Sequence, residues 1–332
     1  MKKIEHVLIA GAGAVGLTVA HQLFKYNPKA ISILAHSDRL VRYKKNGLHV
    51  NSEKIDFHLV DAKNPQLPTE SGKAELVIIA CKNEHLPAIL DDLQHCIGEN
   101  SLILSLLNGI SSETMIAQRY GEEKNPLAMI LGTDAQHNAE YTVYNETGII
   151  YFGDNENVLT DGKVGTQCTQ RIRLIADFFE SAHIHYDVPE NMLRKLWYKF
   201  MMNVGINQAS AVLRLPYSMF QTTSPDFVPE ARELMRSLMR EVLKLSELEG
   251  IGKGKGGALS ENDIEACCKT LDTLTSASRT SMCQDVLAGR KTEAELFSKT
   301  VSDLGKKHAV ATPINDTLYL QLRTIEQSYG KA

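Results

Sequence analysis

A short apolar run followed at once by three closely spaced glycines is the feature that most limits the folds open to this chain. Residues 6–10 form a β-prone run, and the chain continues Gly11-Ala12-Gly13-Ala14-Val15-Gly16 into an amphipathic stretch. G-x-G-x-x-G between a strand and a helix is typical of a dinucleotide-binding unit, in which backbone amides approach a pyrophosphate. We therefore expect Gly11, Ala12, Gly13, Ala14, Val15 and Gly16 to bind a dinucleotide. The alternative is a glycine-rich turn without a ligand.

The first half of the chain alternates short β-prone runs with amphipathic stretches. This alternation indicates a parallel sheet covered by helices, that is, an α/β fold with an N-terminal Rossmann-like doubly wound parallel sheet. The segments that carry it are the expected strands His6–Ala10, Ile31–Ala35, Leu76–Ala80 and Ser101–Leu106, the expected helices Val15–Tyr26, Asp38–Lys45 and Leu86–His95, and then an extended Gly148–Gly153 and a helical Gln170–Ser181.

The composition changes near Asp187-Val188-Pro189-Glu190, and strand signals nearly disappear beyond it. Helices are expected at Asn191–Leu213, Phe227–Glu249, Ser260–Gly289, Glu293–Lys307 and Asn315–Ser328. We therefore expect two domains in the 332 residues, a dinucleotide-binding Rossmann-like domain at 1–188 and an all-helical substrate domain at 189–332. The glycine- and lysine-rich tract at 250–257 is expected to be a flexible, solvated loop, with contact to an anionic ligand as the alternative.

The overall composition excludes several classes of function. A net charge of −4 gives no field that would attract nucleic acid or an anionic membrane, and no apolar run approaches the roughly 18 residues of a membrane span. The start of the chain reads as a strand and not as a signal peptide, because Glu5 and His6 interrupt it. The cysteines show no metal-ligand spacing, so we expect no metal site and a reducing, cytoplasmic location.

The end of the second strand bears on which dinucleotide binds. A carboxylate about 20 residues after the glycines would hold the ribose hydroxyls of NAD, but this chain has His36 there, and Asp38 lies beyond the strand tip. His36, Ser37 and Arg39 are suited to a 2′-phosphate, since arginine matches phosphate geometry. We expect NADP (as NADPH), with NAD not excluded. The alternative is that Asp38 caps a helix and Arg39 is solvated.

A polar stripe interrupts the apolar segment Trp197–Asn207. Lys199, Asn203 and Asn207 recur every four residues, so on an α-helix they share one face with a drift of only about 80°. A buried ammonium group needs a partner or a polar ligand. Two interpretations stay open, a polar lining for a ligand cavity or the polar edge of a helix whose other faces are buried.

These features together resemble the ketopantoate reductase family (2-dehydropantoate 2-reductases), from the glycine loop to the segment Ala311–Asn315. Four further motifs carry the resemblance: Cys81-Lys82 after a strand, Asn108-Gly109 after a strand, the stripe Lys199-x3-Asn203-x3-Asn207, and Ser281-Met282-x-Gln284-Asp285 followed by Gly289-Arg290-x-Thr292-Glu293.

The resemblance implies NADPH-dependent reduction of 2-dehydropantoate to pantoate, with the active site in a cleft between the domains. It makes Lys199 the general acid and Glu293 its partner, which also contacts the cofactor. Lysine chemistry agrees with this role, because an ammonium group can stabilise and protonate a developing oxyanion. The remaining implied site residues are Asn203, Asn207 and Ser281 for the substrate, Lys82 for the cofactor, and Asn108 for both.

Several positions depart from the family pattern, among them Leu107, Ser111, Ala294-Glu295, Ser298 and the strand-tip His36. They leave open a reductase of another branched or aromatic 2-keto acid, and the use of NAD. A rival of another class is a dinucleotide-binding sensor without turnover. The joint presence of Lys199, Asn203, Asn207 and Glu293 argues against it. A homodimer is also left open, because helical domains of this size often dimerise.

Overall fold

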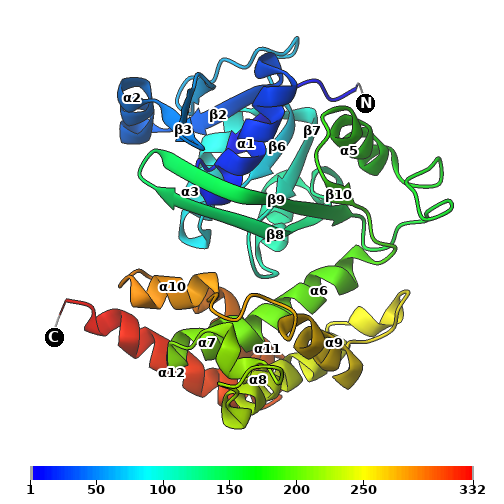
Figure 1. Ribbon diagram of the computed structural model, residues 1–332. Helices are drawn as coiled ribbons and strands as arrows, with labels where there is room; N and C mark the ends of the chain where they lie inside the picture. The colour runs from blue at the N-terminus through cyan, green and yellow to red at the C-terminus, as the bar shows by residue number, and fades with distance from the viewer. Residues whose placement is uncertain (1–2, 331–332) are drawn as a thin grey trace. The chain divides into compact units, whose positions relative to one another are not determined.

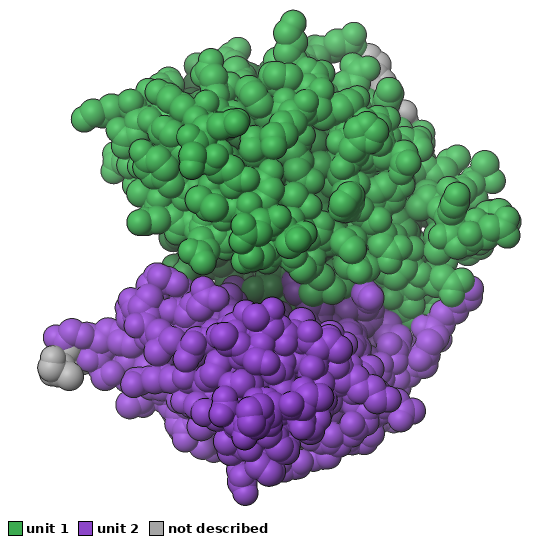
Figure 2. All heavy atoms as spheres, in the orientation of Figure 1, with its two compact units in different colours: residues 1–193 green, residues 194–332 purple. Residues whose placement is uncertain are grey.

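The computed structural model describes residues 3–330. The chain divides into two compact units, unit 1 at residues 1–193 and unit 2 at residues 194–332 (Figures 1 and 2). The boundary falls in the first turn of α6 (Met192–Met202), whereas the composition change placed it at 188.

Within the described residues, no helix is both long enough and apolar enough to cross a membrane. All six cysteines are unpaired thiols.

Unit 1 is built on a five-stranded parallel sheet with the order β5-β2-β1-β6-β7. Alternate residues of β1 enter different cores: Val7 and Ile9 pack with α1 and α5, whereas Leu8 and Ala10 pack with α3 and α4. Helices on both faces confirm the doubly wound class. The elements are β1 (Val7–Ala10), β2 (Ile31–Ala35), β5 (His58–Asp61), β6 (Ala74–Ile79), β7 (Ile97–Ser105), α1 (Ala14–Tyr26), α2 (Ser37–Asn46), α3 (Leu86–Asp92), α4 (Ser112–Tyr120) and α5 (Gln170–Ser181).

A second sheet lies against α1 and was mostly missed by sequence analysis. Its main part is the antiparallel pair β8 (Leu127–Asn138) and β9 (Tyr141–Gly153), of which only Gly148–Gly153 was expected to be extended. Helix α1 contacts β8 and β9 as well as β1 and β2 (Figure 1). All residues in the outer half of β8 are partly or largely exposed, so this half lacks a strong apolar signal. The short strands of this sheet are β3 (Leu48–Val50), β4 (Glu53–Ile55) and β10 (Tyr186–Asp187).

Unit 2 is all-helical over its described residues, as expected. Two predicted helices contain π-helical turns, which hydrogen-bond from i to i+5 in place of i to i+4. One is η5 (Asn203–Asn207), between α6 and α7, and the other is η8 (Glu295–Lys299), before α11. The α-helices are α6 (Met192–Met202), α7 (Gln208–Leu213), α8 (Pro229–Leu248), α9 (Glu261–Leu271), α10 (Ser281–Leu287), α11 (Thr300–His308) and α12 (Pro313–Ser328).

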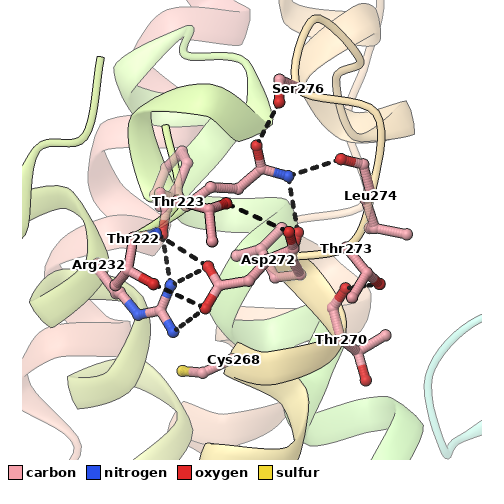
Figure 3. A network of polar contacts seen from close by, with 12 residues as sticks. Thr222, Thr223, Arg232, Cys268, Thr270, Asp272, Thr273, Leu274 and Ser276 are labelled. Carbon is pink, nitrogen blue, oxygen red and sulfur yellow. Dashed lines mark hydrogen bonds and ion pairs between the residues drawn. The ribbon is translucent and has the colours of Figure 1, made fainter. Parts of the chain in front are cut away.

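The prediction of one helix over Ser260–Gly289 is wrong, because α9 ends at Leu271 and α10 begins at Ser281. Side chains from outside the segment bind the end of α9. The Gln221 amide donates to the carbonyl oxygens of Leu271 and Leu274, both at 2.8 Å, and Asp272 pairs with Arg232 at 2.7 Å (Figure 3). The last carbonyls of a helix need donors from elsewhere, and here tertiary partners provide them.

Candidate active site

The glycine loop between β1 and α1 uses its three glycines in different ways. Gly11 has φ of 120°, and a Cβ there would lie 2.5 Å from the Ala80 carbonyl oxygen. A Cβ on Gly16 would lie 1.8 Å from the Gly11 carbonyl oxygen, so α1 approaches the loop only because this residue has no side chain. At Gly13, by contrast, a Cβ would meet nothing within 4 Å. This open space in front of the loop suits the close approach of a pyrophosphate.

The start of α1 lies at the same place. Gly13 precedes the helix and contributes no side-chain cap, and Ala14 and Val15 are the first two helical residues. The N-terminus of a helix attracts anions through its backbone amides and its dipole. Ala12 is almost completely buried and belongs to the core of unit 1. The loop therefore presents backbone, and not side chains, to a phosphate group.

The other predicted cofactor residues of unit 1 follow the carboxyl ends of neighbouring strands. His36 comes directly after β2, Lys82 shortly after β6, and Asn108 shortly after β7. Because β2, β6 and β7 run parallel to β1 in the same sheet, the three residues and the glycine loop share one edge of it. This is the edge at which ligands bind in open α/β sheets. The residue after Asn108 is Gly109 with φ of 88°, which agrees with the predicted Asn-Gly turn.

His36 has a partner that the sequence did not indicate. Its Nδ1 lies 2.8 Å from a carboxylate oxygen of Asp92, at the end of α3, which leaves Nε2 for a ligand. Arg39 is exposed in the first turn of α2. Burial raises the pKa of the Cys81 thiol to about 11, and the positive charge of Arg39 opposes this rise. His36 and Arg39 are thus placed at the same edge of the sheet as Lys82.

Lys199, Asn203 and Asn207 lie on one buried helical segment of unit 2, with 5%, 6% and 9% of their surface exposed. The segment is not the continuous α-helix that was predicted, since Asn203–Asn207 form the π turn η5. On an α-helix, a step of four residues rotates by slightly more than one full turn about the axis. On the wider π-helix, the same step rotates by slightly less than one full turn. The rotation between residues four apart therefore deviates from a full turn in opposite senses on the two kinds of helix. π turns inside α-helices occur frequently at functional sites.

Ser281 and Glu293 lie on or beside elements that contact η5. Ser281 is the exposed first residue of α10, whose N-cap Thr280 accepts a hydrogen bond from the Cys283 amide. Glu293 is half-buried in the turn before η8, and its carbonyl oxygen accepts from the Leu296 amide at 2.9 Å. Both α10 and η8 contact η5. Unit 2 thus places its five predicted residues on elements grouped around one π turn.

Among residues 3–330, no group of three or more His, Cys, Asp or Glu side chains is arranged to hold a metal ion.

The glycine- and lysine-rich tract at 250–257 is partly held by Arg194. The Nε of Arg194 donates to the Gly257 carbonyl oxygen at 3.0 Å, and its Nη2 pairs with Asp263 at 2.9 Å.

A glycine loop at the carboxyl edge of a parallel sheet, followed by an all-helical unit, defines a Rossmann-type dinucleotide-binding protein with a helical second domain. The family description "Ketopantoate reductase PanE/ApbA" matches residues 7–157, and "Ketopantoate reductase PanE/ApbA C terminal" matches residues 191–326. The chain therefore belongs to the ketopantoate reductase family of oxidoreductases.

Individual relatives are distant. The 2-dehydropantoate 2-reductase of Vibrio cholerae is 27% identical over 78% of this chain and 80% of its own length. Among solved structures, a D-mandelate dehydrogenase with NADH and anilino(oxo)acetate superposes with a TM-score of 0.80 at 21% identity, over 98% of this chain and 99% of the other. A dimeric ketopantoate reductase from Staphylococcus aureus has a TM-score of 0.74 at 20% identity, over 98% and 100%. At these identities the two structures show the shared fold.

Proposed function

We propose that this protein reduces 2-dehydropantoate to pantoate with NADPH. The observation that carries the proposal is the buried stripe Lys199, Asn203 and Asn207 in a chain whose other unit presents an open glycine loop. A ligand-binding loop alone would serve a sensor equally well. A buried ammonium group followed by two amides on the same helical segment has a direct use in reducing a ketone. The curated relatives that act on 2-dehydropantoate support that substrate.

NADPH, when bound, supplies the hydride for the carbonyl carbon of the keto acid. The Lys199 ammonium stabilises the negative charge that develops on the carbonyl oxygen and then donates a proton to it. Asn203 and Asn207 donate hydrogen bonds to the substrate without adding charge. Glu293 orients the Lys199 ammonium and accepts from a substrate hydroxyl. Ser281, Asn108 and Lys82 are proposed to hold the substrate carboxylate and the nicotinamide end of the cofactor.

For the cofactor, the glycine loop from Gly11 to Gly16 is proposed to bind the pyrophosphate. His36 and Arg39 are proposed to bind the 2′-phosphate that distinguishes NADP from NAD, Arg39 through its guanidinium and His36 through Nε2. A carboxylate that would hold an unphosphorylated ribose is missing from the tip of β2, although Asp92 lies beside His36.

The first test is oxidation of NADPH and NADH by the purified protein with a panel of 2-keto acids that includes 2-dehydropantoate. Efficient turnover of 2-dehydropantoate with NADPH would support the proposal. Turnover only of other keto acids, branched or aromatic, would keep the chemistry and change the substrate. Tight cofactor binding with no turnover of any keto acid would favour the sensor.

The second test replaces the proposed general acid. Lys199→Ala should lower kcat by about 10²–10⁴-fold, the range for loss of a general acid, with NADPH binding retained. Lys195→Ala, one turn earlier in α6, is the matched control and should keep kcat near the wild-type value. Turnover of Lys199→Ala within a few-fold of the wild type would refute the assignment.

We also infer a homodimer and a reducing location such as the cytoplasm. The dimeric ketopantoate reductase from Staphylococcus aureus supports the first inference, and the six unpaired cysteines support the second. Light scattering coupled to size exclusion would give the mass in solution, and a monomer at micromolar concentration would contradict the dimer.

A further inference from the structure

One buried carboxamide joins the two π turns of unit 2. Gln208 is the first residue of α7, and none of its surface is exposed. Its Nε2 donates to the carbonyl oxygen of Val204, inside η5, at 2.9 Å. Its Oε1 accepts from the backbone amide of Ser298, inside η8, at 3.0 Å. The same side chain therefore satisfies one backbone group in each π turn.

The polar groups around Gln208 determine how the carboxamide is oriented. The Val204 carbonyl can only accept, and the Ser298 amide can only donate, so the nitrogen of Gln208 must face η5 and its oxygen must face η8. A π turn interrupts the regular α-helical ladder, and a buried backbone group left without a partner costs free energy. Among uncharged and ionised side chains of this length and shape at neutral pH, the carboxamide offers both a donor and an acceptor, whereas a carboxylate only accepts.

Gln208 is itself braced by two longer helices. Its Nε2 also donates to Oδ1 of Asn315 in α12, at 3.1 Å. Asn315 in turn donates from Nδ2 and from its backbone nitrogen to Oε2 of Glu241 in α8, at 2.8 and 3.0 Å. Gln208 and Asn315 are both completely buried. A buried polar network whose members are satisfied holds its elements in one arrangement.

The hydrogen bonds of Gln208 connect the helical segment that carries Lys199 with the turn that carries Glu293, the two parts of the proposed catalytic group. Val204 and Gln208 directly follow Asn203 and Asn207, whereas Ser298 lies one turn beyond Glu293. We propose that Gln208 is a positioning residue that sets the register of the Lys199 helix against the Glu293 turn. This inference rests on the function proposed above, and Gln208 acts only through these neighbours, without touching the substrate.

The test compares two substitutions at this position. Gln208→Met keeps the approximate volume and removes all three hydrogen bonds. Gln208→Glu keeps the shape and the acceptor for Ser298, but it turns an oxygen toward the Val204 carbonyl. Both variants should lower kcat by about 10–100-fold, because an error of about 1 Å in catalytic geometry costs up to about 10²-fold. KM for NADPH should change less than kcat, since the glycine loop, His36 and Arg39, which are proposed to bind the cofactor phosphates, are all in unit 1.

The pH dependence of kcat is a second measurement, because a purely structural role of Gln208 would leave that dependence unchanged. If Gln208 sets the spacing of Lys199 and Glu293, the pH profile of kcat should shift in both variants. In Gln208→Glu, protonation restores a donor toward the Val204 carbonyl, so its kcat should recover relative to that of Gln208→Met as the pH falls.

Gln221 provides a matched control in the same unit. It is almost completely buried, and it donates to two backbone carbonyls at the end of α9 (Figure 3). It also accepts a hydrogen bond from the Ser276 hydroxyl at 2.7 Å. Gln221→Met should lower Tm and leave kcat and its pH profile unchanged. The proposal is overturned if both Gln208 variants keep wild-type kcat and pH profile, or lose no more kcat than Gln221→Met. Absence of turnover in the wild type would instead refute the proposed function.

Discussion

Gly13 and Gly16 lie three residues apart where the β1–α1 turn enters α1, yet the chain needs them for different reasons. A Cβ at Gly16 would lie 1.8 Å from a backbone oxygen, whereas one at Gly13 would meet nothing within 4 Å. Gly16→Ala should therefore lower the free energy of unfolding by about 2 kcal/mol or more, as overpacking does. Gly13→Val should leave Tm nearly unchanged and weaken NADPH binding about tenfold or more.

Thermal unfolding and fluorescence titration with NADPH would measure both effects. Gly72→Ala is a useful reference, since a Cβ there also meets nothing within 4 Å, although its φ of 65° adds some strain. If Gly13→Val binds NADPH as the wild type does, the phosphates do not approach the loop at this residue.

The choice of cofactor also belongs to the residue scale. Arg39 is exposed in the first turn of α2, just after the carboxyl end of β2. Arg39→Ala should raise KM for NADPH about tenfold or more and change KM for NADH by less than about twofold, because only NADPH carries the 2′-phosphate. Steady-state kinetics with both cofactors measures this difference. Equal effects on the two cofactors would contradict a role in phosphate recognition.

At the scale of elements, the Asp272 network shows how tertiary partners end a helix. Asp272 accepts hydrogen bonds from Arg232 in α8 and from the backbone and side chain of Thr222 (Figure 3). Burial by itself would raise the pKa of Asp272, but these hydrogen bonds outweigh it and hold the pKa below the ordinary value of 3.8. The ionised carboxylate thus stabilises the folded state.

The sign of the pH dependence follows from this shift. Because the folded-state pKa is the lower one, the stabilisation is fully present above pH 3.8 and is lost as the pH falls through the folded value. Asp272→Asn should lower the free energy of unfolding by about 1–3 kcal/mol at pH 7, and the difference should shrink in acid.

Urea unfolding at pH 7 and at a series of lower pH values would measure it. Glu247→Gln is the control, since its partner Lys244 lies at 3.1 Å on an exposed surface and such pairs contribute little. A destabilisation by Asp272→Asn that stays constant down to pH 2 would show that the carboxylate charge is not its cause.

At the scale of the whole molecule, unit 1 contains a complete fold. Its two apolar clusters, one on each face of the parallel sheet, consist only of residues between Ile4 and Val188. A fragment of residues 1–193 should therefore unfold cooperatively and bind NADPH, but it should not reduce any keto acid, because it lacks Lys199 and Glu293. Circular dichroism during heating and a binding titration would test this. A fragment that is soluble but shows no cooperative transition would contradict an independent unit.

Much of the architecture was determined by local patterns. The period of the apolar residues predicted β1, β2, β6 and β7 and the helices α1, α2 and α3, but it missed β5 and α4. The glycine spacing predicted the turn in which Gly11 has a φ of 120°. The absence of strand signals beyond residue 188 predicted the all-helical second unit. These features depend on residues that are close in the chain, so a sequence carries them without reference to the rest of the fold.

Tertiary structure decided what depends on distant partners. The partner of His36 is Asp92, α9 ends where Gln221 and Arg232 reach it, and the turns η5 and η8 share the side chain of Gln208. The sequence did place Lys199, Asn203 and Asn207 on one helical segment, but it did not predict the π turn at Asn203–Asn207. The reason is physical: a buried polar group takes whichever partner the folded chain brings to it, and separation along the sequence does not specify that partner.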